Sequence, residues 1–507
     1  MSVISKIEEV VRTRANEVFV VDAQSGAEYT FAEFHEKAIV FSEGLARSGV
    51  TRGDKLAILL PNSVDHAVLI FACLYSGIVT VPINKSLTEN EVGVVLREGG
   101  ISKVLHDADF VGSKGLSELI ESSLLFEDFV AMCGSDPRAA SPFKPFSGVH
   151  EDDIMTIIFT SGTTGTPKGV VHCIKTLFNN AQLYCSAVGI TTENRFYNML
   201  SMSYLGGYYN LLVLPFIAGA SVVVTDAFSP HSAMDFWTPI IKNKINTIWL
   251  VPTIISIIME FDRGDDGVEY CKQNSITALV GTAPLLDSIK SSFEDKYGVE
   301  LLQNYGLSET LFITSNTPET SINMGVGKVL DGIEVVIDKS VSPVEGSEEG
   351  EIVVKSPHLM TEYINNPEGP SAEGFFRTGD LGYFDEGQLH ITSRLKDLII
   401  RSGLNISPIT IENVIQKHDG VTRCAVVGIP HRINGEEIVA VVSLKESMKL
   451  KDIQKEIVDL CNKELSSSKV PSFFFQVDSF PMGSSGKIKK GDLREVVAMK
   501  MAGSKLA

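Results

Sequence analysis

The sequence lacks the features that mark several classes of protein. It contains no run of about 18 apolar residues, the length that a membrane-spanning helix requires. Its seven cysteines are scattered and form no Cys-x-x-Cys pair, which excludes a disulfide framework or a zinc site and is typical of a reducing compartment. The first residues lack the apolar core of a signal peptide, so we expect a cytoplasmic protein.

Basic residues are also scarce. The chain has 44 Lys and Arg residues against 63 Asp and Glu residues, which gives a formal net charge of −19. This excess of negative charge argues against nucleic acid or an anionic membrane as a partner. It does not exclude a local site for a small anion, because charges farther apart than about 8 Å are largely screened at physiological salt.

Short apolar segments alternate with helical patterns along most of the chain. For example, apolar segments at 55–60 and 79–83 flank an expected helix at 64–76. This alternation predicts an α/β fold with largely buried parallel strands. At 332–354 and 374–392 the hydrophobic period shortens to two, with turn residues between, which predicts a small antiparallel β unit.

The length of 507 residues exceeds one ordinary hydrophobic core, so at least two domains are expected. The composition changes at Arg394-Leu395-Lys396-Asp397, and the residues beyond carry their own α+β alternation. We predict a large N-terminal domain of residues 1–394, built from stacked α/β sheets plus the small β unit. Residues 395–507 would form a smaller, mobile α+β C-terminal domain. Monomer and homodimer both stay open.

A loop rich in glycine and hydroxyl groups follows an apolar, β-branched strand at 154–159. Its sequence is Thr160-Ser161-Gly162-Thr163-Thr164-Gly165-Thr166-Pro167-Lys168-Gly169. Free N–H groups and hydroxyls can converge there on an anion, and Lys168 adds a point charge. A Walker-type loop is rejected because Pro167 separates Thr166 from Lys168 and no hydroxyl follows the lysine. A flexible surface linker is the alternative, but the buried strand that leads into the loop favours a phosphate site.

Two further clusters carry groups suited to a nucleotide. Asn304-Tyr305-Gly306-Leu307-Ser308-Glu309-Thr310 follows an expected buried strand, and ligands of α/β sheets bind at such strand ends. Thr378-Gly379-Asp380 offers a carboxylate that only accepts hydrogen bonds, as a vicinal diol requires, and Arg394 lies farther along the chain. Ordinary packing around Tyr305 and a surface ion pair of Asp380 are the alternatives.

Two stretches near the C-terminus complete the pattern. The segment 393–408 contains Lys396 and Gly403, and Lys487 lies on the Gly/Ser-rich stretch 481–488. Taken alone, the first reads as a loop into a helix capped by Asn405 or Ser407, and the second as a solvated surface lysine.

Together these five stretches resemble the adenylate-forming superfamily of acyl-CoA synthetases, luciferases and peptide-synthetase adenylation domains. The resemblance covers about residues 30–490. It implies ATP, Mg²⁺ and coenzyme A, or the phosphopantetheine of a carrier protein, as cofactors. It implies that Tyr305 packs on adenine, that Ser308 contacts the α-phosphate, and that Asp380 accepts both ribose hydroxyls. The implied ATP- or AMP-binding residues are Thr160, Ser161, Gly162, Thr163, Thr164, Gly165, Lys168, Ala283, Pro284, Tyr305, Gly306, Ser308, Asp380, Arg394 and Lys487.

The resemblance also implies roles in catalysis and domain movement. The catalytic residues would be Lys487, Glu309 and Thr164, with Glu309 as the metal ligand. Lys396 would be the hinge between the domains, and Gly403 would line the tunnel for the thiol. The acyl pocket would lie near Tyr204, Gly281 and Asn304.

The implied function is that of an acid–thiol ligase, which joins a carboxylic acid to the thiol of coenzyme A through an acyl-adenylate. Ser203-Tyr204 departs from the Phe-His that the family often has there. The segment 206–212 is more similar to acyl- or aryl-CoA ligases than to amino-acid adenylation domains. Three alternatives stay open: loading of an acyl carrier protein, a non-catalytic homologue that acts as a binding protein, and a luciferase-like oxygenase. The acid itself is not specified.

Overall fold

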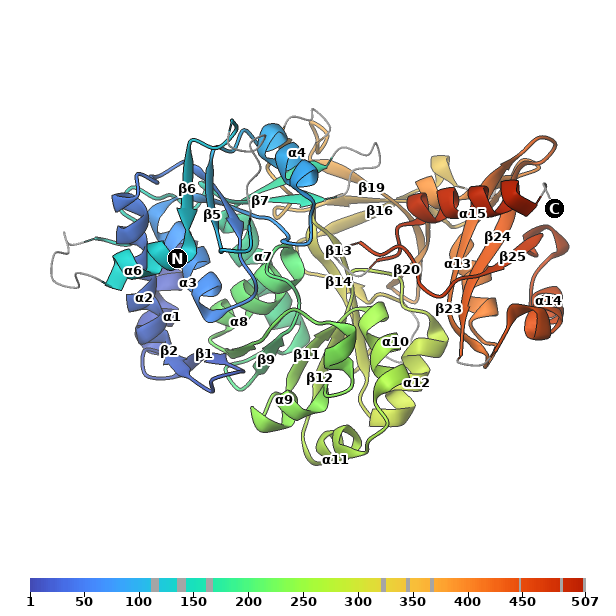
Figure 1. Ribbon diagram of the computed structural model, residues 1–507, viewed down its shortest axis with the longest axis horizontal. Helices are drawn as coiled ribbons and strands as arrows, with labels where there is room; N and C mark the ends of the chain where they lie inside the picture. Colours follow the sequence, from blue (N-terminus) through green and yellow to red (C-terminus); the bar gives the residue numbers. More distant parts are fainter. Residues whose placement is uncertain are drawn as a thin grey trace.

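Two mixed β-sheets form the framework of the N-terminal part of the chain (Figure 1). The computed structural model describes residues 1–110, 118–134, 143–160, 167–320, 325–342, 347–364, 369–445, 448–483 and 487–504. One sheet has the order β15 (Lys328–Val329), β14 (Leu311–Ser315), β13 (Leu301–Leu307), β12 (Thr277–Val280), β11 (Thr247–Leu250), β9 (Arg195–Asn198), β10 (Ser221–Val224), β1 (Val18–Asp22), β2 (Glu28–Thr30). The other has the order β18 (Glu362–Ile364), β8 (Lys168–Cys173), β7 (Ile154–Thr160), β4 (Val79–Pro82), β3 (Lys55–Leu59), β5 (Lys103–His106), β6 (Ser122–Leu125).

The predicted parallel core is present in both sheets. Strand β3 pairs in parallel with β4 and β5, and β12 pairs in parallel with β11 and β13. The sequence analysis missed β8, which pairs antiparallel with β7 and runs directly out of the expected phosphate loop. It also ended the strand before Tyr305 too early, since β13 continues to Leu307.

Helices pack on the sheets. The described helices of the N-terminal part are α1 (Val3–Thr13), α2 (Phe31–Arg47), α3 (Val64–Ser76), α4 (Glu89–Gly99), α6 (Phe126–Gly134), α7 (Ile174–Val188), η1 (Gly206–Val213), α8 (Leu214–Ala218), η2 (Pro230–Ala233), α9 (Trp237–Lys242), α10 (Pro252–Phe261), α11 (Asp266–Gln273), α12 (Asp287–Tyr297) and η3 (Lys339–Val341). Thr30 opens α2 with a capping box, in which its side chain accepts from the Glu33 N–H and the Glu33 carboxylate accepts from the Thr30 N–H. Helix α3 is buried along almost its whole length, as a helix at the centre of a large core must be.

The small antiparallel β unit has the order β16 (Glu334–Asp338), β17 (Gly350–Lys355), β19 (Phe375–Asp385), β20 (Gln388–Arg394). Its core packs Ile352, Val354 and Leu389 against Tyr305 of β13 and Tyr363 of β18. This unit therefore holds the ends of both large sheets close to one another.

The C-terminal elements form a separate body at the right of Figure 1, joined through the end of β20. Its sheet contains β22 (Leu404–Ile406), β21 (Ile399–Arg401), β24 (Gly435–Leu444) and β23 (Val421–His431), and β25 (Phe473–Gln476) pairs with β24. Its described helices are η4 (Leu395–Asp397), α13 (Pro408–Ile415), α14 (Leu450–Glu464), η5 (Ser467–Lys469) and α15 (Lys490–Ser504). Two hydrophobic clusters of its own fill this body. The fold class is thus the predicted one, while the boundary at residue 394 stays a prediction.

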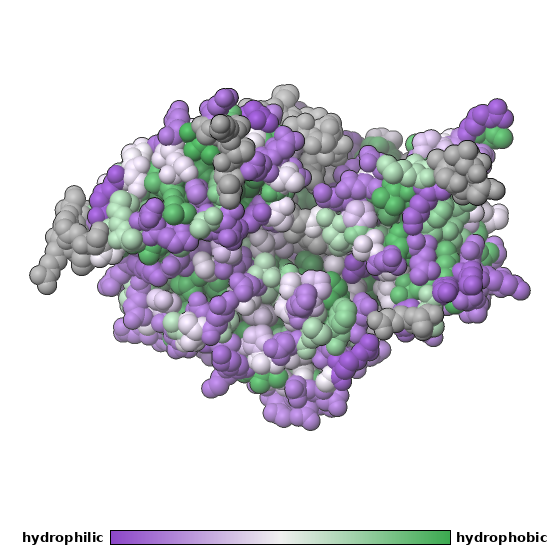
Figure 2. Space-filling view, in the orientation of Figure 1, coloured by the Kyte–Doolittle hydropathy of each residue, from purple (hydrophilic) through white to green (hydrophobic). Residues whose placement is uncertain are grey.

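The surface agrees with the composition. Hydrophilic side chains cover most of the face in Figure 2, with smaller hydrophobic patches over the C-terminal sheet. In the part of the chain that the structure describes, no helix is both long and apolar enough to cross a membrane. The seven cysteines are free and buried.

Candidate active site

A carboxylate held by two partners lies where the small β unit meets β13. Asp380 on β19 is only 3% exposed. Its Oδ2 accepts a hydrogen bond from Tyr305 Oη at 2.8 Å, and Arg394 Nε lies 2.7 Å from its Oδ1. Burial, and then the charge of Asp380, raise the pKa of Tyr305 well above its usual value, so the phenol stays a donor. The structure therefore brings together three predicted nucleotide-binding residues from three different strands.

Gly306 lies near the end of β13, and Ser308 and Glu309 follow in the turn between β13 and β14. A Cβ on Gly306 would lie 2.0 Å from the Leu311 carbonyl oxygen, so only glycine fits there. Glu309 Oε1 accepts a hydrogen bond from Tyr363 Oη at 2.6 Å, and the Glu309 carbonyl accepts from the Met360 N–H at 2.7 Å. The position of Glu309 is thus fixed by the segment that leads into β18.

A buried histidine supports the neighbouring residue. His172 Nε2 lies 2.6 Å from the Ser308 carbonyl oxygen, which can only accept, so Nε2 donates. Burial lowers the pKa of His172 to about 4, which leaves the ring neutral at physiological pH. The sequence analysis missed both His172 and Tyr363. Neither follows a recognisable spacing from the residue that it supports.

The phosphate-loop residues divide into two groups. Thr160 ends β7 and Lys168 begins β8, and the two face each other as cross-strand partners. Lys168 Nζ lies 5.2 Å from the centre of the Tyr363 ring, within range of a cation–π contact. The predicted contacts of Ser161, Gly162, Thr163, Thr164 and Gly165 lie outside the described residues.

The expected acyl pocket is partly assembled. Asn304 Nδ2 donates to the Val280 carbonyl at 3.0 Å, and a Cβ on Gly281 would lie 2.3 Å from Asn304 Oδ1. Asn304 and Gly281 are therefore in direct contact, and any larger residue at 281 would displace the amide. Ala283 and Pro284 follow in the loop after β12. Tyr204 lies just before η1. Its ring packs against Gly206, since a Cβ added to Gly206 would lie 2.5 Å from Cε2 of Tyr204.

Lys487, which belongs to the predicted small domain, interacts electrostatically with residues of this site. Loss of solvent lowers its pKa to about 8, and repulsion by Arg394 and Lys396 adds to the effect, while Asp380 and Glu309 oppose it. The Lys487 residue is nonetheless exposed at the surface of the protein, and the charged groups that act on it belong to the N-terminal part and to η4. Lys487 therefore stands within electrostatic range of the carboxylates of the N-terminal part.

The predicted hinge residue, Lys396, and the predicted tunnel residue, Gly403, lie in the same short segment at the start of the C-terminal body. Lys396 is in η4, directly after β20, and burial with the charge of Arg394 lowers its pKa. Gly403 lies in the turn between β21 and β22, where Ser402 and Gly403 have φ of 53° and 81°. Two consecutive positive φ values define the tight hairpin turn that favours glycine.

Glu309 suits a metal ion that arrives with a nucleotide. Among the described residues, no group of three or more His, Cys, Asp or Glu side chains could hold a metal on its own. Mg²⁺ is typically bound by one or two carboxylates together with substrate phosphates and water. Since Tyr363 occupies only Oε1, the carboxylate of Glu309 keeps a second oxygen that could serve as such a ligand. When bound, Mg²⁺ would neutralise phosphate charge there.

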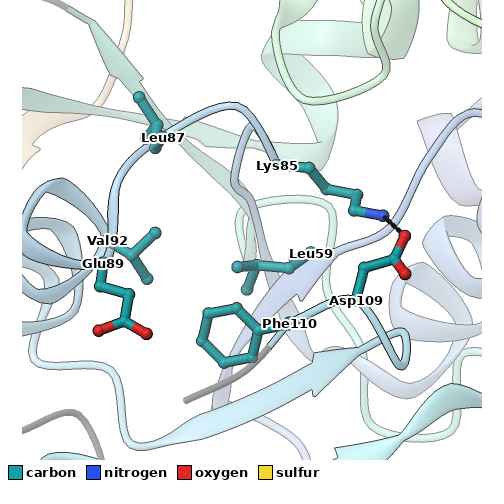
Figure 3. Close-up of a pocket in the computed structure, with 7 residues that line it drawn as sticks. All are labelled: Leu59, Lys85, Leu87, Glu89, Val92, Asp109 and Phe110. Atoms are coloured by element: carbon teal, nitrogen blue, oxygen red, sulfur yellow. Dashed lines mark hydrogen bonds and ion pairs between the residues drawn. The ribbon is translucent and has the colours of Figure 1, made fainter. Parts of the chain in front are cut away.

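A cavity of about 280 Å³ lies elsewhere, at the carboxyl ends of β3, β4 and β5 (Figure 3). It is lined by Leu59, Lys85, Leu87, Glu89, Val92, Asp109 and Phe110. Lys85, the one cation among the described residues of this lining, pairs with Asp109 at 3.1 Å and also with Asp107. Because acidic groups already engage that lysine, this cavity is a poor phosphate site and is distinct from the site around Asp380.

A large α/β domain with nucleotide-suited groups at its strand ends, faced by a lysine of a small C-terminal domain, defines a two-domain adenylate-forming enzyme. The family model described as AMP-binding enzyme matches residues 7–364, and the model of its C-terminal domain matches residues 410–487. The chain belongs to the AMP-binding enzyme family, as the sequence motifs predicted.

Relatives and solved structures cover nearly the whole chain. It is 28% identical to the long-chain-fatty-acid–CoA ligase FadD13 of Mycobacterium tuberculosis, over 94% of each protein. It is 30% identical to the oxalate–CoA ligase of Arabidopsis thaliana, over 87% of this chain and 88% of that protein. The o-succinylbenzoate CoA synthetase of Bacillus subtilis, solved with its acyl-adenylate intermediate, is 27% identical with a TM-score of 0.82, covering 96% of this chain and 97% of that one. The same enzyme has been solved with ATP and a magnesium ion.

Proposed function

We propose that this protein is an ATP-dependent acid–thiol ligase that forms acyl-coenzyme A. The observation that carries the proposal is the buried carboxylate of Asp380, which accepts a hydrogen bond from Tyr305 and lies 2.7 Å from Arg394. Lys487 of the small domain lies within electrostatic range of this carboxylate and of Glu309. An ammonium group beside nucleotide-binding carboxylates is the arrangement that adenylate formation requires. The relatives named as CoA ligases support the reaction class, and ATP with magnesium in a solved relative supports the cofactors.

The first half-reaction joins the acid to AMP. A carboxylate oxygen of the acid attacks the α-phosphorus of ATP, a new O–P bond forms, and the bond to the β-phosphate breaks as pyrophosphate leaves with the electron pair. Asp380 would hold the ribose, and Lys487 would stabilise the charge that develops at the α-phosphate. Catalysis of this step is mainly positioning and charge neutralisation.

The second half-reaction uses another arrangement of the domains. The small domain would turn about Lys396, which removes Lys487 from the site and brings the hairpin of Gly403 toward it. A thiolate then attacks the acyl carbon, a C–S bond forms, and AMP leaves. The CoA ligases among the relatives favour free coenzyme A over a carrier-bound pantetheine as the acceptor.

The acid and the setting are finer parts of the proposal. The relatives act on acids as different as long-chain fatty acids and oxalate, so they leave the substrate open. Seven free, buried cysteines fit the reducing cytoplasm that we propose as its location.

The test is ATP–pyrophosphate exchange with a library of carboxylic acids. We expect exchange that depends on one class of acid, followed by acyl-CoA formation when coenzyme A is added. Acyl transfer to carrier proteins but not to coenzyme A would show that a carrier protein is the acceptor. Light emission with oxygen would indicate a luciferase-like activity. Nucleotide binding without exchange for any acid would make the chain a non-catalytic binding protein.

A further inference from the structure

Tyr363 touches two charged residues of the site at once. Its hydroxyl donates to Glu309 Oε1 at 2.6 Å, while Lys168 Nζ lies 5.2 Å from the centre of its ring. Glu309 follows β13 and Lys168 begins β8, so the two charges come from different sheets. We propose that Tyr363 is a positioning residue that aligns the metal-binding carboxylate with the phosphate-binding lysine. The proposal rests on the proposed function.

The tyrosine is itself fixed by its backbone. Strand β18 pairs antiparallel with β8, so that Tyr363 faces Val170, and the Thr361 N–H donates to the Val171 carbonyl at 2.8 Å. On the other side, the Met360 N–H donates to the Glu309 carbonyl. The segment 360–364 thus ties β8, which begins with Lys168, to Glu309.

Gly169 permits this close pairing. A Cβ at position 169 would lie 2.4 Å from Cγ2 of Ile364, the cross-strand partner of Gly169. A side chain there would push β18 away from β8 and move Tyr363 with it. Gly169 is therefore required for the close pairing of β18 with β8, and not only for the turn of the loop.

The two contacts act by different physics. The hydrogen bond orients one oxygen of Glu309 and leaves the other to face the metal, as outer-shell partners of metal ligands do. The ring face attracts the ammonium of Lys168 and so holds it at the start of β8 without neutralising its charge. Only 8% of the surface of Tyr363 is exposed, which limits its own motion. Replacing the hydroxyl or the ring separates the two effects.

Binding measurements on Tyr363→Phe and Tyr363→Leu test the proposal, using ATP with Mg²⁺, ATP with EDTA, and AMP. Tyr363→Phe keeps the ring, so we expect about a 10-fold loss of affinity for ATP with Mg²⁺ and no change for the other two ligands. Tyr363→Leu also removes the ring. Tyr363→Leu should therefore lower the affinity for ATP in EDTA by about 2- to 5-fold. The affinity for AMP, which lacks the outer phosphates, should not change.

Tyr270→Phe is the matched control, because it removes a part-buried tyrosine hydroxyl that donates to the Ile245 carbonyl at 3.0 Å, on α11 and outside this network. It should leave all three affinities unchanged. Thermal unfolding of each variant reports folding separately. Unchanged Mg²⁺ dependence in Tyr363→Phe, or equal losses for all three ligands, would overturn the positioning role. A wild-type protein that binds no ATP would instead overturn the proposed function and this inference with it.

Discussion

Arg394 lies directly opposite Asp380 on the neighbouring strand, and its Nε is 2.7 Å from the Asp380 Oδ1. Arg394 is also the last residue of β20, so the chain passes from this ion pair into η4 and Lys396 at once. The proposed rotation would therefore begin two residues beyond Arg394, which is anchored by the buried carboxylate of Asp380. With this anchor, a small domain could turn without disturbing the residues that we propose hold the ribose.

The contact with the ribose is tested by Asp380→Asn. The amide keeps the volume of the carboxylate but loses the charge and one acceptor. ATP affinity should fall by about 1.5–3 kcal/mol, the value of a hydrogen bond to a charged group. Binding of 2′,3′-dideoxy-ATP, which lacks both hydroxyls, should change little. Equal losses for the two nucleotides in a calorimetric titration would show that Asp380 does not contact the ribose.

The metal role of Glu309 is tested by Glu309→Gln. The Gln carbonyl can still accept from Tyr363, so the local structure should persist while one charged ligand is lost. We expect the Mg²⁺ concentration for half-maximal adenylation to rise at least about 10-fold, with thermal stability near that of the wild type. A variant with wild-type Mg²⁺ dependence would remove Glu309 from the metal site.

Much of the fold follows from local pattern. The helix at 64–76 and the strands that flank it at 55–60 and 79–83 lie where the hydrophobic periods predict them. Strands β21 and β22, in contrast, fall in the segment 393–408, which the sequence alone favoured as a loop into a helix. Strand β8 was missed because its short apolar stretch sits between a glycine-rich loop and a helix, and only pairing with β7 makes it a strand. Pairing between distant segments is a tertiary effect that no local pattern reports.

The site shows the same division. Asp380, Arg394 and Tyr305 were predicted from motifs, and the structure brings them together. Tyr363 and His172 were not, because the residue that each supports, Glu309 or Ser308, lies far along the chain, at separations of 54 and 136 residues. A motif identifies groups that touch a ligand, whereas the groups that orient them depend on where the fold places their backbone.

The thiol tunnel is tested by Gly403→Leu. A side chain there should obstruct the thiol, so acyl-adenylate should accumulate while its conversion to the thioester slows. Because φ at position 403 is 81°, the substitution also strains the hairpin, and Gly26→Leu is the matched control. Gly26 has φ of 75° in another turn, and like Gly403 it has no atom within 4 Å of an added Cβ. In single-turnover assays of both half-reactions, we expect only thioester formation to slow, and only in Gly403→Leu. Wild-type thioester formation there would exclude a tunnel at this position.

The charge of Lys487 should limit adenylation at alkaline pH. Its pKa is lowered from the usual range to about 8, so the free enzyme loses the ammonium as the pH rises through that value. The ammonium is the form that stabilises the α-phosphate, so kcat/KM for ATP in pyrophosphate exchange should fall above about pH 8. Lys487→Arg keeps a positive charge at all these pH values and should abolish that decline, even if its rate at pH 7 is lower.

Lys487→Ala separates the two half-reactions. Removing one preorganised stabilising group should slow adenylation by about 10²–10³-fold and remove the alkaline decline. Thioester formation from supplied acyl-adenylate should survive, because the rotated domain would carry residue 487 away from the site. Single-turnover measurements of each step provide the comparison, with Lys489→Ala as the control, since Lys489 is a nearby exposed lysine of the same domain. Equal damage to both steps in Lys487→Ala would mean that one arrangement of the domains serves both reactions.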